Sequence, residues 1–239
     1  MTIAVKICGL SDEISVRAVI ESGADFVGFV HYPKSPRHVS IEKAAQLKSL
    51  LPESIKSVMV VVDPNDELLV EIASEMQPDY LQLHGNESQS RIREIISSLR
   101  GKAEAIHNSE KNWIASSREA PRNDKRIGII KAISVRNSDD IKIAEDYHGI
   151  ADFLLFDAKP TNDKMMYGGN GIAFDWDILS GNLANKNWFL AGGLNAENVE
   201  QAIKISGAKM VDVSSGVERS SGVKDAKMIE DFVKTVRDL

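Results

Sequence analysis

The stretch Ile3-Ala4-Val5-Lys6-Ile7-Cys8-Gly9 predicts a buried β-strand that ends on a cysteine. A second stretch, Asp152-Phe153-Leu154-Leu155-Phe156-Asp157, has the same form and ends on a carboxylate. In a parallel α/β barrel, side chains at the C-terminal ends of strands lie on the face that carries catalysis. The two stretches together therefore predict a thiol and a carboxylic acid that face one pocket.

Similar apolar, β-branched runs recur along the whole chain. They begin near Ile3, Asp25, Lys56, Asp79, Ile127, Asp152, Trp188 and Lys209. Between them lie segments with helical spacing, clearest over 41–51, 195–205 and 225–237. Eight strands alternating with eight helical segments predict a closed (β/α)₈ barrel (a TIM barrel) or a doubly wound sheet.

The expected ends of the helices carry typical capping residues. Asn195 is a predicted N-cap. Gly23, Gly149 and Gly207 each precede a strand and are predicted to end a helix in the left-handed conformation. These glycines favour a repeated βα unit.

One interval between strands is too long for a single βα unit. Most predicted strand starts are 21 to 36 residues apart, but Asp79 and Ile127 are 48 apart. The excess is polar and rich in turn-forming residues, and it predicts an insertion at 101–126 between strands four and five, with a short helix near 110–117. The whole chain, 1–239, is expected to form one domain around it.

Composition narrows the class of protein. A chain of 239 residues with 43% hydrophobic content suits one large α/β domain. A net charge of -6 without a Lys/Arg stripe argues against a nucleic-acid partner. The single cysteine excludes an intramolecular disulfide and, with no signal peptide before the first strand, predicts a cytoplasmic location. No apolar run approaches about 18 residues, so no membrane span is expected.

Cys8 and Asp157 each have a structural alternative. A free cysteine often only packs in a core, although Gly9 would let a ligand approach the backbone here. A carboxylate after four apolar residues faces a pocket or caps a turn. The loop that follows, 158–171, ends in glycines and is predicted to be an active-site lid.

Basic and glycine-rich segments supply candidate binding residues. Arg37 follows the second strand and could fork onto a carboxylate, or could be a solvated loop charge. Gly192-Gly193 and Ser215-Gly216 follow the last two strands, where barrels of this kind commonly bind phosphate. Either turn alone is ordinary.

His84 also ends a strand, and a structural role is as plausible as a substrate-lining or catalytic one. The chain has no HExxH, CxxC, Walker or GxSxG motif, so no motif supports a metal site or nucleotide hydrolysis.

Taken together, these segments resemble the phosphoribosylanthranilate isomerase family of tryptophan biosynthesis. The resemblance is carried, in family order, by Val5-Lys6-Ile7-Cys8-Gly9, Gly28-Phe29-Val30 with Pro33-Lys34-Ser35-Pro36-Arg37, Gln82-Leu83-His84-Gly85, Ile130-Lys131-Ala132, Gly168-Gly169-Asn170-Gly171 with Phe174-Asp175-Trp176, Gly192-Gly193-Leu194-Asn195 with Glu197-Asn198-Val199, and Val211-Asp212-Val213-Ser214-Ser215-Gly216-Val217-Glu218. The matched segments span nearly the whole chain outside 101–126.

The resemblance implies a (β/α)₈ barrel that isomerises N-(5′-phosphoribosyl)anthranilate by an Amadori rearrangement, without a cofactor. It implies Cys8 as general base and Asp157 as general acid. It also implies that Arg37 holds the anthranilate carboxylate and that Asp212 contacts a sugar hydroxyl. The two glycine turns would bind the phosphate. The expected partner is thus a small phosphosugar, and the chain is expected to be a monomer or a homodimer.

Three departures from the family pattern are visible: the 101–126 segment, an extended lid, and His31 where an aromatic residue is usual. Two other functions remain open. The related histidine-pathway sugar isomerase uses aspartate at both catalytic strand ends, which Cys8 and the lack of clear half-to-half repetition disfavour. A non-catalytic phosphate-binding barrel is disfavoured because the acid–base pair is retained.

Overall fold

The computed structural model describes residues 2–99, 126–158, 167–168, 171–172, 176–179 and 187–239. The predicted insertion at 101–126 lies outside the described residues except for its last residue. The short helix expected near 110–117 lies wholly outside them, as does most of the predicted lid at 158–171.

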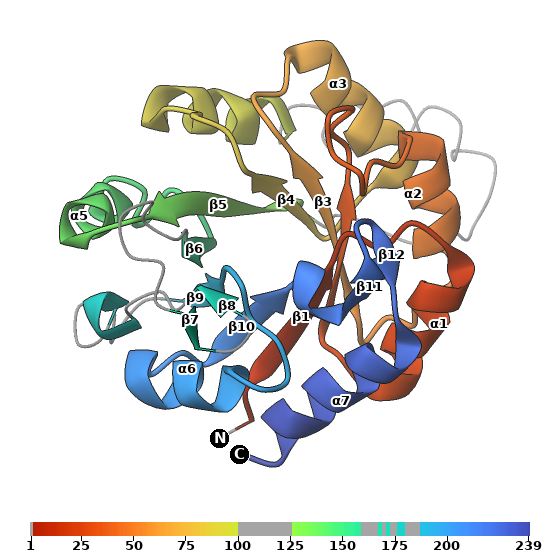
Figure 1. Cartoon of the computed structure of the whole chain (residues 1–239). Coiled ribbons are helices and arrows are strands. Elements are labelled where there is room, and N and C mark those ends of the chain that lie inside the picture. The colour runs from red at the N-terminus through yellow and green to blue at the C-terminus, as the bar shows by residue number, and fades with distance from the viewer. Residues whose placement is uncertain (1, 100–125, 159–166, 169–170, 173–175, 180–186) are drawn as a thin grey trace.

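Eight parallel strands form a closed barrel (Figure 1). Around the barrel the order is β1-β10-β9-β6-β5-β4-β3-β2, so the first strand pairs with the last. The strands are β1 Ala4–Cys8, β2 Phe26–Val30, β3 Lys56–Val61, β4 Tyr80–Leu83, β5 Gly128–Val135, β6 Phe153–Ala158, β9 Trp188–Ala191 and β10 Met210–Val213. Each starts within one residue of its predicted position. Closure confirms the (β/α)₈ barrel and excludes the doubly wound sheet.

Helices surround the barrel, with α1 and α7 side by side next to β1 (Figure 1). They are α1 Glu13–Ser22, α2 Ile41–Lys48, α3 Asp66–Glu71 with the π-helical η1 Ile72–Met76, a helical segment over 89–99, α5 Ser138–Glu145, the 3₁₀ turn η2 Trp176–Leu179, α6 Val199–Ser206 and α7 Ala226–Arg237. Two short hairpins, β7 Tyr167–Gly168 with β8 Gly171–Ile172 and β11 Glu218–Ser220 with β12 Val223–Lys224, and the 3₁₀ turn η3 Ser215–Val217 complete the described elements. None of the described helices has the length and apolarity needed to span a bilayer.

Helix ends follow the capping prediction in part. Gly23 and Gly207 end α1 and α6 with φ of 75° and 71°. Gly149 also has a positive φ of 79°, but α5 has already ended at Asp146. Gly149 therefore lies in the turn between α5 and the next strand and does not end the helix.

The N-terminus of α6 differs from the prediction. Its N-cap is Asn198, and Asn195 lies one turn earlier. The Asn195 side chain accepts hydrogen bonds from the backbone N–H groups of Glu197 and Asn198 at 2.9 and 3.0 Å. Asn195 therefore closes the turn that leads into the helix, because its side chain competes locally for backbone donors.

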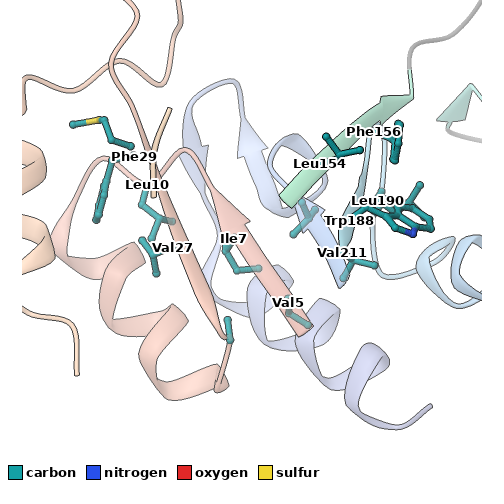
Figure 2. Close-up of a cluster of buried hydrophobic side chains, with 14 of the residues drawn as sticks. Val5, Ile7, Leu10, Val27, Phe29, Leu154, Phe156, Trp188, Leu190 and Val211 are labelled. Atoms are coloured by element: carbon teal, nitrogen blue, oxygen red, sulfur yellow. The ribbon is translucent and has the colours of Figure 1, made fainter. Parts of the chain in front are cut away.

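Strand side chains alternate between two layers. Val5 and Ile7 of β1 belong to the larger apolar core, which also includes Val211 of β10 (Figure 2). Cys8 belongs instead to a smaller cluster made by the inward-facing residues. Because successive side chains point to opposite faces of a strand, Lys6 shares the inner face with Cys8.

Four aromatic rings fill part of the barrel interior. Phe26, Tyr80 and Phe153 are the first residues of β2, β4 and β6, and Phe189 is the second residue of β9. The centroids of rings in contact are 5.2 to 6.3 Å apart, and Phe26 and Phe189 meet edge to face at 87°. This packing fills the interior near the N-terminal ends of the strands and leaves polar chemistry to the opposite ends.

An ion pair outside the barrel holds the loop after β4. Lys131 lies on the outer face of β5, and its Nζ is 2.7 Å from Oε2 of Glu87. Both side chains are buried, with 4% and 1% exposure. Glu87 also accepts hydrogen bonds from the backbone N–H groups of Asp63 and Gly85. The pair therefore connects β5 to the loops that follow β3 and β4.

Removing one member of this pair should destabilise the protein strongly. We expect Glu87→Gln to lower the free energy of unfolding by about 3–5 kcal/mol, because the Lys131 ammonium would remain buried without its carboxylate. Urea unfolding monitored by circular dichroism measures this change. The control is Glu200→Gln, which removes an exposed pair with Lys204 and should change stability little. Equal effects of the two substitutions would contradict the structural role of Glu87.

Candidate active site

Cys8 lies at the C-terminal end of β1 and faces the barrel interior. It pairs in register with Gly28 of β2, and a Cβ atom at Gly28 would lie 2.7 Å from the Cys8 sulfur. Glycine at position 28 thus makes room for the thiol. Cys8 is 7% exposed, and burial raises the pKa of its thiol, while the positive charge of Lys6 opposes that rise.

Lys6 and Asp212 form an ion pair inside the barrel. They are register partners on β1 and β10, and Nζ of Lys6 lies 2.8 Å from Oδ1 of Asp212. Lys6 is fully buried and the Asp212 side chain is 9% exposed. Cys8 lies two residues further along the same inner face of β1, and the positive charge of Lys6 lowers the pKa of its thiol. The predicted base and the predicted sugar-binding aspartate are therefore linked through one ammonium group.

Asp157 lies near the C-terminal end of β6 and faces the interior beside the end of β4. Its Oδ2 is 3.4 Å from Nε2 of His84. Nδ1 of His84 lies 3.0 Å from Nε2 of Gln82. Nε2 is the ring nitrogen that faces Asp157. His84, whose role the sequence left open, thus contacts the predicted acid.

Arg37 binds a carboxylate of the protein itself. Its Nε and Nη2 donate to Oε1 and Oε2 of Glu218 at 2.6 and 2.7 Å, a two-pronged contact. Lys224 donates to the same carboxylate at 2.7 Å and to the carbonyl of Ser214 at 2.9 Å. Glu218 takes the Nε–H and one N–H of Nη2 of Arg37, so the two N–H groups of Nη1 and the second N–H of Nη2 remain for a substrate group.

These charges lie beside Cys8. A Cβ atom at Gly9 would lie 2.6 Å from Cδ of Arg37, so the arginine stem crosses the end of β1. The Ser214 hydroxyl donates to the Cys8 carbonyl at 3.0 Å. The loop after β2 and the β11–β12 hairpin therefore meet next to the thiol.

The two predicted glycine turns lie against each other. A Cβ atom at Gly216 would overlap the carbonyl oxygen of Leu194. Gly192 and Gly193 have φ of 95° and 64°, values that favour glycine. Ser215 begins the short η3 turn and is exposed. The turns after β9 and β10 therefore form one continuous surface of backbone at the C-terminal face.

His31 pairs with another ring in the loop after β2. Its ring centroid is 5.0 Å from that of His38, and its Nδ1 lies 3.0 Å from the carbonyl of Val39. His31 therefore helps to shape the loop that carries Arg37.

A recess of about 190 Å³ lies on the opposite face of the barrel. It is lined by Lys56, Asp79, Tyr80, Arg126, Gly128 and Asp152, at or just before the starts of β3 to β6. Arg126 pairs with Asp152 at 2.9 Å, and Asp152 also accepts the backbone N–H of Ile129. Charges at this end of a (β/α)₈ barrel serve stability, so the recess is not the candidate site.

The structure thus groups the predicted residues in three sets: Cys8 with Asp212 and Arg37, Asp157 with His84, and the glycine turns with each other. Sequence reasoning assigned no role to Lys6. Its signal was present, because a lysine two residues before Cys8 in a buried strand must share the inner face. Glu218 and Lys224 carried no comparable signal, because only the tertiary structure brings them to Arg37.

Comparison with known proteins leads to one family. The family model "N-(5'phosphoribosyl)anthranilate (PRA) isomerase" matches residues 5–125 and 106–235. The chain is 40% identical over 237 residues to the N-(5′-phosphoribosyl)anthranilate isomerase of Paramagnetospirillum magneticum, covering 99% of this chain and 98% of the relative.

Solved structures lead to the same family. A phosphoribosylanthranilate isomerase from Thermotoga maritima superposes with a TM-score of 0.79 at 35% identity. One in complex with reduced 1-(o-carboxyphenylamino)-1-deoxyribulose 5-phosphate gives 0.76 at 33%. Monomers generated from the dimeric Thermotoga maritima enzyme give 0.77 at 33%. Each comparison covers 100% of both chains.

The contact between Glu218 and the two cations predicts a pH-dependent contribution to stability. Arg37 and Lys224 donate to this carboxylate and lower its pKa from 4.5 to about 2, although burial alone would raise it. A carboxylate whose pKa is depressed in the folded state stabilises the protein above its unfolded pKa. The contribution is therefore complete above pH 4.5 and is lost as the pH falls toward about 2.

We expect the stability difference between the wild type and Glu218→Gln to be largest above pH 4.5 and to shrink as the pH falls toward about 2. Urea unfolding at a series of pH values from acid to neutral measures the difference. Glu230→Gln, at an exposed position, is the control and should show no such trend. A difference that is independent of pH would contradict the assignment.

Proposed function

The chain belongs to the N-(5′-phosphoribosyl)anthranilate isomerase family, and we propose that Cys8 and Asp157 exchange the protons of its reaction. The protein is an isomerase of tryptophan biosynthesis that converts N-(5′-phosphoribosyl)anthranilate into 1-(2-carboxyphenylamino)-1-deoxyribulose 5-phosphate by an Amadori rearrangement. The observation that carries the proposal is the position of Cys8 and Asp157: both face the interior of one closed barrel at the C-terminal ends of its strands.

The first step opens the ribose ring. Asp157 donates a proton to the ring oxygen, the bond between that oxygen and C1′ breaks, and the anthranilate nitrogen forms a Schiff base with C1′. The ring oxygen becomes a hydroxyl group. The position of Asp157 at the end of β6, next to His84, supports its contact with the sugar end of the substrate.

The second step moves hydrogen from carbon. The Schiff base makes the C2′ proton acidic, the Cys8 sulfur takes that proton, and the electron pair of the C–H bond forms the enolamine. The enolamine then tautomerises to the ketone as C1′ gains a proton. General acid–base assistance of this kind contributes about 10²–10⁴-fold to each transfer.

Three further contacts would hold the substrate. The N–H groups that Glu218 leaves free on Arg37, two on Nη1 and one on Nη2, would bind the anthranilate carboxylate. Oδ2 of Asp212 would accept a sugar hydroxyl, since Lys6 holds Oδ1. The adjoining glycine turns after β9 and β10 would bind the phosphate through backbone N–H groups, supported by the short η3 turn that follows β10.

Two broader expectations belong to the same proposal. A cytoplasmic location is supported by the single cysteine and by the role in amino-acid biosynthesis. The chain would act as a monomer or a homodimer on a small phosphosugar. The dimeric relative supports the second form, and sedimentation of the purified protein distinguishes the two.

Substitution of the acid and the base should lower turnover. We expect Cys8→Ser and Asp157→Asn each to lower kcat by about 10²-fold or more with KM changed little, because each removes a proton-transfer group and not a binding contact. The loss of substrate fluorescence measures the rate, and circular dichroism controls for folding. If folded Cys8→Ser keeps nearly the wild-type kcat, Cys8 is a packing residue and not the base.

A charge at the glycine turn should weaken phosphate binding. A Cβ atom at Gly193 meets nothing within 4 Å, but its φ of 64° makes any side chain costly there. Gly193→Gln and Gly193→Glu share that cost and nearly the same size, so they differ mainly in charge. We expect KM to be at least about tenfold higher for Glu than for Gln, because a carboxylate near the phosphate repels it. Equal KM values would place the phosphate elsewhere.

A further inference from the structure

Lys6 is a charged residue in an unusual place. It is fully buried inside the barrel, among the largest side chains with no solvent exposure. A buried ammonium is costly unless it is paired and its N–H groups are hydrogen-bonded. Asp212 takes one of its three donors at 2.8 Å, and Cys8 lies two residues further along the same inner face of β1, where the charge of Lys6 acts on the thiol. The lysine therefore connects a carboxylate on β10 to the sulfur on β1.

A second buried lysine gives a useful contrast. Lys131 has a similar burial and a similar carboxylate distance, 2.7 Å to Glu87. Its remaining bonds go to the backbone carbonyls of Leu83 and Gly85, which organise a loop. Lys131 has a structural explanation on the outer face of the barrel, whereas Lys6 directs its charge at the one thiol of the chain.

Several charged groups act on Cys8. Lys6 precedes it on β1, Asp212 faces it from β10, and Lys224 approaches from β12. Arg37 also acts on the thiol, from the loop after β2, although Glu218 neutralises much of its charge. Burial is the largest influence on the thiol and raises its pKa, and Lys6 is the largest influence in the opposite direction. Without Lys6, burial and Asp212 would both favour the protonated thiol. Of the groups named here, Lys224 and Arg37 would still favour the thiolate.

We propose that Lys6 is a positioning residue for the isomerisation, with its ammonium, held by Asp212, stabilising the negatively charged sulfur that Cys8 needs to take the C2′ proton. The inference rests on the proposed role of Cys8 as base. Before the transfer the thiol must lose its proton to solvent, which burial disfavours, and the ammonium of Lys6 then balances the charge of the sulfur. The C2′ proton then passes to the sulfur, and the electron pair of the C–H bond stays with the substrate.

The single cysteine makes the proposal directly measurable, because the thiolate signal comes from one residue. The thiolate absorbance of the folded protein, and its rate of alkylation by iodoacetamide, are followed against pH in the absence of substrate. We expect Lys6→Met to raise the pKa of Cys8, so that alkylation near neutral pH slows about tenfold. Lys6→Arg, which keeps the charge, should stay closer to the wild type.

Two double variants separate the direct effect from its alternatives. Lys6→Met/Asp212→Asn removes both charges, so no buried charge is left unpaired, and the thiol pKa should still lie above the wild-type value. Lys131→Met/Glu87→Gln is the matched control, which removes an equally buried pair on the outer face and should leave the thiol unchanged. If Lys6→Met/Asp212→Asn titrates like the wild type, Lys6 only neutralises Asp212 and the proposal is overturned.

Turnover supplies an independent readout. We expect Lys6→Met to lower kcat about tenfold near neutral pH with KM changed little, and kcat should recover toward the wild-type value at high pH as the thiolate forms. A loss of kcat that does not recover, with an unshifted thiol titration, would show a purely structural role. The thiol titration needs no substrate, so it tests the role of Lys6 separately from the role of Cys8. An unshifted titration would overturn the role of Lys6 even if the kcat of Cys8→Ser supports Cys8 as the base. A shifted titration could likewise be seen even if Cys8→Ser refutes the base role.

Discussion

The pairing of β1 with β10 is the constraint on which the candidate site depends. These strands lie at opposite ends of the chain, and their register sets Lys6 beside Asp212, 206 positions away in the sequence. The same pairing brings Ser214 against the Cys8 carbonyl. A closed sheet has no free edge. A slip of one residue in the pairing would also move the inner side chains of a strand to its outer face, so the register is strongly specified. Closure of the barrel therefore also fixes the surroundings of the thiol.

Burial of charge follows one rule at three places. Lys6, Lys131 and Lys224 each lose nearly all contact with water, and each lies within 2.8 Å of a buried carboxylate. A charge removed from water requires a partner of opposite sign and satisfied hydrogen bonds. The three pairs differ in where they lie: one holds a loop on the outer face, one joins the β11–β12 hairpin to Arg37, and one lies inside the barrel beside Cys8.

The two ends of the barrel have different tasks. Phe26, Tyr80, Phe153 and Phe189 fill the interior near the N-terminal ends of the strands with ring contacts. The C-terminal ends carry the thiol, the carboxylates and the glycine turns. This separation lets the aromatic packing supply rigidity, while the polar groups at the other end are held within hydrogen-bonding distance of one another.

The sequence by itself determined the strands, their order along the chain and the face on which Cys8 and Asp157 lie, because apolar runs and the alternation of side chains are local properties. It also indicated Gly192-Gly193 and Ser215-Gly216 as a common surface. Only the tertiary structure decided that the barrel closes, that Arg37 forks onto Glu218 and that Asn198, not Asn195, holds the N-cap position of α6. It alone joined Lys6 to Asp212 and His84 to Asp157. These contacts depend on register and packing between distant segments, for which a single sequence holds no local pattern.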